Sequence, residues 1–149
     1  MKLHAAEADF KQMVLEKYKA NTYTQHIGFN LTHLDAGIAE GQLPVRPEFV
    51  QQLNFLHGGL TATSADIVMG FAAFTLVKKG QHIVTADLRV SYLNPAVSAV
   101  IYAKGMVIKA GKRLHFCEAE LWTETDGQRL IVAKASSTMA VIEADDVVR

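Results

Sequence analysis

The sequence predicts an α+β fold in which an antiparallel sheet wraps around a long central helix. The first observation behind this prediction is the segment from residue 58 to residue 79, which is apolar on almost every face of a helix and must therefore be surrounded by protein. The second is the chain after residue 83, where strand-like stretches follow one another with short turns between them. Consecutive strands of this kind form an antiparallel sheet, and a concave sheet can enclose such a helix.

The N-terminal part of the chain, residues 1–20, is predicted to carry an amphipathic surface helix from residue 5 to residue 19. Its apolar residues recur at spacings of three and four among Glu and Lys side chains: Phe10, Met13, Val14 and Tyr18. Residues 27–43 then change to short apolar runs interrupted by Asp35-Ala36-Gly37, which has the composition of a hairpin turn. Two strands are therefore predicted in this segment.

Between the predicted hairpin and the central helix, Pro44 and Pro47 exclude a regular strand ladder. Residues 45–56 are therefore predicted to form an ordered loop that leads into the helix. Beyond the helix, four long strands are predicted over residues 83–93, 97–109, 113–125 and 129–142. Turn-forming sequences such as Asn94-Pro95 separate these strands, so the four are predicted to form a meander.

The composition excludes several classes of function. The chain has 149 residues, the size of one domain, so a single domain over residues 1–149 is expected. Fifteen Lys and Arg residues balance fifteen Asp and Glu residues, so the basic field that nucleic-acid binding needs is absent. The single cysteine, Cys117, cannot form an intramolecular disulfide, and the N-terminus has no apolar leader, so a cytoplasmic location is expected.

One segment is long enough to be considered as a membrane span. It covers residues 60–77 and has 18 residues, but it contains Ser64, Asp66 and three threonines. Polar and charged groups of this kind are costly in lipid. We therefore expect a helix buried in protein and no membrane partner.

His57-Gly58-Gly59 stands where the predicted loop enters the central helix. Glycines allow another molecule to approach the backbone closely, and the first turn of a helix presents unpaired N–H groups with a positive partial charge. This combination predicts a site that polarises a carbonyl or binds an oxyanion, with Gly58 and Gly59 beside the ligand. The alternative is structural: the glycines allow a tight entry into the helix, and His57 is a packed loop residue.

Asp66 lies in the middle of the apolar helix, where a buried carboxylate is costly unless it is paired or hydrogen-bonded. Two interpretations follow. Asp66 is either a structural carboxylate bonded to Thr63, Ser64 or nearby backbone, or a general base or nucleophile that faces a cleft. Gly70, one turn further along the same face, would leave room for a ligand beside it.

The spacing between these groups predicts a homodimer. His57 and Asp66 are nine residues apart, which corresponds to about 13.5 Å and about two and a half turns of helix, so they point to opposite sides. If both serve one site, that site combines His57 of one subunit with Asp66 of another. A two-fold homodimer is the simplest such arrangement, and we expect it to assemble further into a dimer of dimers.

The motifs of this chain resemble one known family. Gln51, His57-Gly58-Gly59, Asp66 and Gly70, followed by residues 85–95 (TADLRVSYLNP), resemble the hotdog-fold acyl-CoA thioesterases of the phenylacetate-pathway (PaaI-like) and 4-hydroxybenzoyl-CoA types. The resemblance extends over about residues 28–141 and implies a hotdog fold. It also implies that the partner is an acyl- or aryl-CoA thioester, which the protein hydrolyses to the free acid and CoA.

The resemblance also implies a role for each matching residue. Gly58 donates its N–H to the thioester oxygen, and Asp66 is the base or the nucleophile. Gln51 assists the nucleophile or the carbonyl, Thr85 orients the water, and His57 positions the reactants. No cofactor is implied, and the remaining histidines are scattered without metal-ligand spacing, so no metal site is expected.

Two other functions stay open at this point. An acyl-thioester dehydratase or hydratase needs a His and an acidic residue as a proton-transfer pair, and the order Asp-x-x-x-x-His expected of it is absent. A non-catalytic acyl-CoA or lipid-binding module would use the same helix but has no need of Asp66. Gln51 and Asn54 also depart from the PaaI-like pattern, which commonly has Asn and Gly there, and these departures leave the substrate open.

Overall fold

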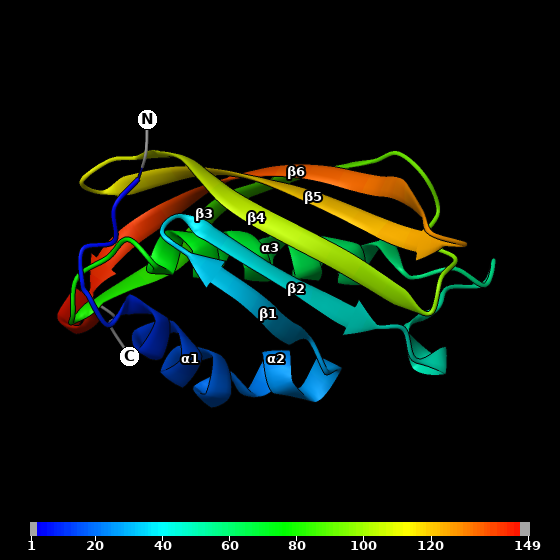
Figure 1. The fold of residues 1–149 in the computed structure, drawn as a ribbon, viewed down its shortest axis with the longest axis horizontal. Helices are drawn as coiled ribbons and strands as arrows, with labels where there is room; N and C mark the ends of the chain where they lie inside the picture. Colours follow the sequence, from blue (N-terminus) through cyan, green and yellow to red (C-terminus); the bar gives the residue numbers. More distant parts are fainter. Residues whose placement is uncertain (1–2, 147–149) are drawn as a thin grey trace.

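A computed structural model describes residues 3–146 of the chain (Figure 1). Its helices and strands follow the sequence as α1 (Phe10–Ala20), α2 (Thr22–Ile27), β1 (Asn30–Asp35), β2 (Ile38–Pro44), α3 (Gly58–Phe74), β3 (Gln81–Tyr92), β4 (Val100–Ala110), β5 (Leu114–Thr125) and β6 (Gln128–Glu143). Two short 3-10 helices, Pro47–Phe49 and Ala144–Asp146, complete this part of the chain. Within it, no helix has both the length and the apolar character that crossing a bilayer requires.

The six strands form one antiparallel sheet in the order β1-β2-β4-β5-β6-β3. β4, β5 and β6 form a meander as predicted, but the prediction that β3 begins this meander is wrong, because β3 pairs with β6 at the far edge. The central helix explains the difference: it follows β2 and carries the chain across the concave side of the sheet, so β3 joins the edge opposite β1 (Figure 1). Asn94-Pro95 then belongs to a segment that crosses back to β4, where the Ala96 carbonyl accepts the N–H of Leu56.

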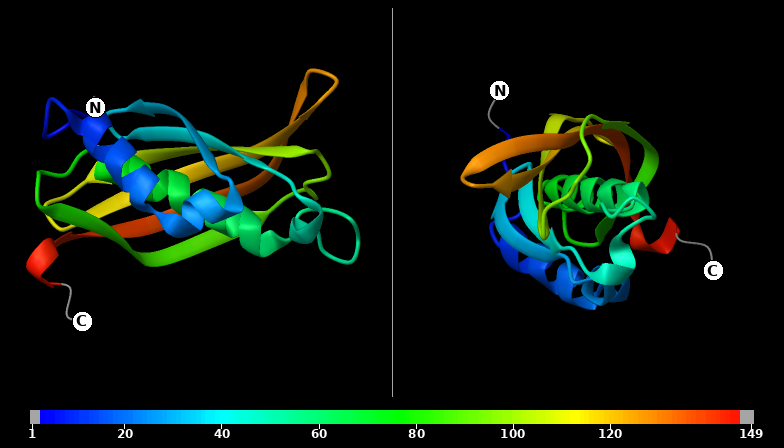
Figure 2. Two further views of the ribbon diagram at one scale, coloured as in Figure 1. Left: turned by 90° about the horizontal axis from the view of Figure 1, so that it is seen from below. Right: turned by 90° about the vertical axis from the view of Figure 1, so that its right-hand side faces the viewer.

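α3 lies inside the curve of the sheet, and α1 and α2 cover the open side next to β1 (Figure 2). Nine of the 17 residues of α3 are buried, which confirms the predicted α+β arrangement of a sheet around a central helix. The helix ends at Phe74, before the predicted end at residue 79. The reason is a buried cap: the Thr75 hydroxyl donates to the Ala72 carbonyl and accepts the Gly37 N–H, each at 2.7 Å.

The N-terminal helical region consists of two helices instead of the single helix predicted over residues 5–19. α1 begins only at Phe10, and α2 was not predicted. The break follows from Asn21, whose side chain accepts the Thr24 N–H at 3.0 Å and caps α2. Gly28 ends α2 with a left-handed φ of 75°, so the first strand starts at Asn30 rather than near residue 27.

Gly105 of β4 allows the sheet to touch the backbone of α3. A Cβ at this position would lie 2.5 Å from the carbonyl carbon of Val68 and 2.7 Å from the nitrogen of Met69. Backbone atoms inside a helix cannot move aside cheaply, so we expect Gly105→Ala to lower the free energy of unfolding by about 3 kcal/mol. Urea denaturation measures this, with Gly70→Ala as the control because a Cβ there meets no atom within 4 Å. Equal destabilisation by both variants would contradict the close approach.

Candidate active site

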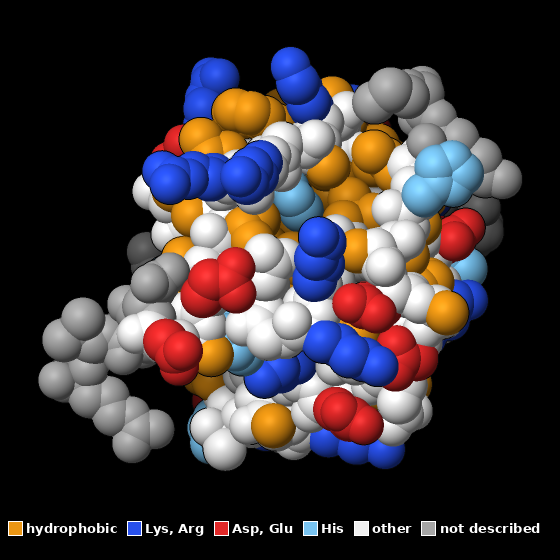
Figure 3. Space-filling model, turned by 90° about the vertical axis from the view of Figure 1, so that its left-hand side faces the viewer, with side chains coloured by type: hydrophobic (Ala, Val, Ile, Leu, Met, Phe, Trp, Pro, Cys, Tyr) orange, Lys and Arg blue, Asp and Glu red, His pale blue; other side chains and the backbone are white. Residues whose placement is uncertain are grey.

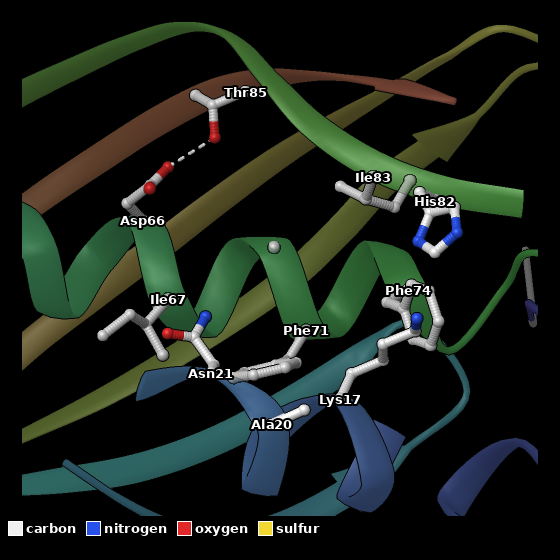
Figure 4. Close-up of a pocket in the computed structure, with 11 residues that line it drawn as sticks. Lys17, Ala20, Asn21, Asp66, Ile67, Phe71, Phe74, His82, Ile83 and Thr85 are labelled. Atoms are coloured by element: carbon white, nitrogen blue, oxygen red, sulfur yellow. Dashed lines mark hydrogen bonds between the residues drawn. The ribbon is translucent and has the colours of Figure 1, made fainter. Parts of the chain in front are cut away.

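Asp66 projects from α3 into an open groove and faces Thr85 of β3 (Figure 4). The Thr85 hydroxyl donates a 2.7 Å hydrogen bond to Asp66 Oδ1. Ser64, a partner considered for a purely structural Asp66, donates to the Leu60 carbonyl instead. Asp66 is also partly exposed rather than buried, because the side of α3 that carries it faces the gap between α1 and β3. Its carboxylate is therefore accessible to a ligand.

The groove beside Asp66 has a volume of about 400 Å³ and extends along α3. Five of the eleven residues that line it have apolar side chains: Ala20, Ile67, Phe71, Phe74 and Ile83. Asp66 and Thr85 lie in one part of it, and Lys17 and His82 line another (Figure 4). Gly70 also lines the groove, and a Cβ added to it would meet open space. A group with both apolar and polar parts therefore fits along α3 beside the carboxylate.

The N-terminus of α3 leaves one backbone donor free. His57 is the N-cap: its Nδ1 accepts the Gly59 N–H at 2.9 Å, so the ring proton is assigned to Nε2. The His57 carbonyl accepts the N–H groups of Leu60 and Thr61. Among residues 3–146, this leaves the Gly58 N–H as the unpartnered donor of the first helical turn. A carbonyl oxygen placed here meets one N–H group and the positive end of the helix dipole.

Tyr92, at the end of β3, contacts this turn. Its hydroxyl donates a 2.8 Å hydrogen bond to the Gly58 carbonyl oxygen. Tyr92 was not among the predicted site residues, since an aromatic residue in a strand is more often part of the sheet packing. Strict alternation from Thr85 would also place it on the opposite face of the strand. A bulge between Thr85 and Asp87 shifts the register, and both Thr85 and Tyr92 pair with residues of the inner face of β6. Residues 85–87 contain no glycine or proline that would mark this bulge in the sequence.

Gln51 and Asn54 belong to the loop before α3. Gln51 Oε1 accepts the Leu53 N–H at 2.8 Å, so the Nε2 of the same amide group points away from Leu53. That Nε2 is buried and has no hydrogen-bond partner among the described residues, as expected of an amide that serves a ligand. Asn54 has a left-handed φ of 64°, a conformation that Asn adopts more easily than most residues. Asn can therefore take the place of the Gly that is common at this position.

Four of the predicted site residues line two different pockets of one chain. Asp66, Gly70 and Thr85 line the groove between α1 and β3. Gly58 lines a second pocket of about 430 Å³, together with Tyr92 and the residues that follow it. Gly58 and Asp66 are eight residues apart on α3, or about 12 Å along its axis. A small reacting group cannot contact both within one chain.

Neither the single cysteine nor a metal cluster forms a competing chemical centre in residues 3–146. Burial raises the pKa of the Cys117 thiol to about 12, so the thiol stays protonated and is a poor nucleophile. Between residues 3 and 146, no group of three or more His, Cys, Asp or Glu side chains is placed to hold a metal ion. At the end of the molecule shown in Figure 3, charges of both signs are mixed, without a large patch of one sign.

Comparison with known proteins identifies the family of this chain. Residues 53–130 match the family model described as the thioesterase superfamily. The proofreading thioesterase EntH of Klebsiella pneumoniae is 27% identical over 104 residues, which cover 70% of this chain and 76% of EntH. Mouse acyl-coenzyme A thioesterase 13 is 31% identical over 88 residues, 58% of this chain and 62% of that protein. A thioesterase family protein of Silicibacter pomeroyi superposes with a TM-score of 0.88 at 26% identity, over 91% of this chain and 99% of its own.

Proposed function

This chain belongs to the thioesterase superfamily and is a thioester hydrolase, and we propose that its substrate is an acyl- or aryl-coenzyme A ester that it cleaves to the free acid and CoA. The membership and the described fold confirm the predicted hotdog-type thioesterase family. The observation that carries the proposed reaction is the accessible Asp66 carboxylate, held by the Thr85 hydroxyl in the groove along α3. A binding module without catalysis has no use for a carboxylate there.

In the proposed reaction, the Gly58 N–H polarises the thioester carbonyl and stabilises the oxyanion that forms on it. Asp66 acts in one of two ways: it removes a proton from the attacking water, or its carboxylate attacks the carbonyl carbon and the resulting anhydride is hydrolysed. In either route a C–O bond forms, the C–S bond breaks and the CoA sulfur leaves. Thr85 holds Asp66 in place by its hydrogen bond. The free Gln51 amide donates a further hydrogen bond to the nucleophile or to the thioester carbonyl.

We further propose that each site is formed by two copies of this chain, with Gly58 from one and Asp66 from the other. The separation of the two groups into different pockets supports this arrangement. β3 also supports it, because this strand is an edge of the sheet and its inner face is incompletely covered: Leu88 is 38% and Tyr92 is 55% exposed. A second copy placed against β3 would cover these side chains and bring Asp66 near the partner's α3 terminus.

The proposed reaction is tested by a hydrolysis screen. Purified protein is incubated with benzoyl-CoA, phenylacetyl-CoA and acyl-CoA esters of short, medium and long chain, and released CoA is measured with a thiol reagent. We expect thiol release from at least one class, and the preferred acyl group identifies the substrate. Absence of thiol release from every ester would contradict the proposed function.

We expect activity to survive exhaustive chelation. The proposed chemistry needs a carboxylate and backbone or amide donors, and none of its steps requires a metal ion. Turnover after incubation with EDTA and gel filtration should equal that of the untreated protein. Loss of turnover that zinc or another divalent ion restores would contradict this prediction.

A further inference from the structure

We propose that Tyr92 is a positioning residue for this reaction: its hydroxyl immobilises the glycine whose N–H polarises the thioester carbonyl. The inference rests on the proposed function, in which the Gly58 N–H is the donor to the substrate. Tyr92 reaches Gly58 from β3, and its hydroxyl oxygen lies 2.8 Å from the Gly58 carbonyl oxygen.

The peptide group between Gly58 and Gly59 is held at both of its ends. Tyr92 donates to the carbonyl end, and His57 Nδ1 accepts the N–H end at 2.9 Å. A peptide group is planar, so fixing both ends fixes its orientation. The Gly58 N–H itself belongs to the preceding peptide group, whose His57 carbonyl oxygen accepts the Leu60 and Thr61 N–H groups. Glycine otherwise has the largest conformational freedom of all residues, so both neighbouring peptide groups must be held to fix the backbone angles of Gly58 and the direction of its N–H. Tyr92 therefore supplies a restraint that Gly58 itself lacks.

The ring of Tyr92 also fits the missing side chain of Gly58. A Cβ on Gly58 would lie 3.2 Å from Tyr92 Cε1 and 3.4 Å from its hydroxyl oxygen, which is tighter than ordinary contact. The absence of a side chain thus allows the ring to approach the helix, and the ring in turn limits the movement of Gly58. The two residues are matched to each other sterically as well as by the hydrogen bond.

Tyr92 is itself held firmly enough to act as a fixed donor. It pairs with Ala133 of β6, and the next two N–H groups, of Leu93 and Asn94, both donate to the Val132 carbonyl oxygen. Val132 is fully packed, with only 1% of its surface exposed. The sheet therefore fixes the backbone from which the Tyr92 side chain projects. The hydroxyl then connects β3 to the N-terminus of α3 through one hydrogen bond.

The test compares Tyr92→Phe with the matched variant Tyr23→Phe. Tyr23 is exposed to a similar degree, 53% against 55%, and within the described chain its hydroxyl has no hydrogen-bond partner. For Tyr92→Phe we expect kcat to fall about tenfold, because a slightly misaligned N–H donor stabilises the oxyanion of the transition state less well. KM and the Kd of a non-hydrolysable thioether analogue of the preferred substrate should change by less than about twofold. Tyr23→Phe should equal the wild type.

Four results would overturn the positioning role. If the wild-type protein hydrolyses CoA esters but Tyr92→Phe has the kcat of Tyr23→Phe, Tyr92 does not position Gly58, and the proposed function still stands. A rise in KM with unchanged kcat would make Tyr92 a substrate-binding residue. Loss of one limb of the pH–rate profile would make it a proton donor. If the wild-type protein itself hydrolyses no ester, the proposed function fails, and the Tyr92 inference fails with it.

A double-mutant comparison checks the contact in solution without relying on activity. Gly58→Ala is expected to lower Tm in the wild-type background, because the new Cβ presses on the Tyr92 ring. In a Tyr92→Ala background the same change should lower Tm less, since the ring is gone. Equal Tm shifts in the two backgrounds would show that the Tyr92 ring does not contact Gly58.

Discussion

Asp66→Asn is expected to reduce turnover by about 100-fold or more while the protein stays folded. Asn has nearly the size of Asp, and its carbonyl oxygen can still accept the 2.7 Å hydrogen bond from Thr85. What is lost is the negative charge that either takes a proton from water or attacks the thioester carbon. Steady-state thiol release with the preferred CoA ester measures the effect.

Asp35→Asn is the matched control for this variant. Asp35 accepts the Ala36 N–H at 2.8 Å in the turn between β1 and β2, and it lines neither the groove nor the pocket at Gly58. Both variants should keep the far-UV spectrum and a thermal midpoint close to the wild type. Near wild-type turnover in folded Asp66→Asn would remove Asp66 from the mechanism, whereas unfolding of Asp66→Asn alone would favour its structural interpretation.

Isotope incorporation identifies the anhydride route when water attacks the anhydride at the Asp66 carbonyl. In a single turnover in H₂¹⁸O, direct attack of water places ¹⁸O in the released acid. Attack by the carboxylate forms an anhydride with Asp66. Hydrolysis at the Asp66 carbonyl then leaves ¹⁸O on the protein, where mass spectrometry of the peptide that contains Asp66 detects it.

Turnover in Thr85→Val should fall with either route, because Asp66 loses its hydrogen-bond donor.

Two variants that are each inactive are expected to restore activity when they are mixed. The first carries Gln51→Ala with His57→Asn, and the second carries Asp66→Ala. Asn at residue 57 keeps a good N-cap for α3, so this variant should remain folded. In a mixed dimer, one of the two shared sites combines an intact Gln51 and His57 with an intact Asp66. Random exchange of subunits should therefore restore about a quarter of wild-type activity.

The experiment requires proof that mixed dimers exist. Different affinity tags on the two variants allow mixed dimers to be isolated by sequential purification, and sedimentation gives their mass. Isolated mixed dimers without activity would contradict the shared site. A fully active monomer would contradict it as well, since one chain places Gly58 and Asp66 in different pockets.

Local chemistry explains the features that were predicted correctly. The apolar surface of residues 58–74 requires enclosure whatever the topology, so a surrounded helix followed from composition and periodicity alone. The start of α3 at His57-Gly58-Gly59 was equally local, because capping and glycine conformation act within a few residues. Asp66 stood out for the same reason, as a carboxylate on an apolar helix that needed a partner.

The sequence by itself therefore determined the fold class, the central helix, the family and the candidate groups at residues 51, 57–59, 66 and 85. The tertiary structure alone decided that β3 lies at the sheet edge beside β6, that Thr85 bonds to Asp66, and that Tyr92 bonds to Gly58. The physical reason is range: propensities, caps and periodicity act over a few residues. Strand order and the bulge after Thr85 depend on packing between segments distant in the sequence.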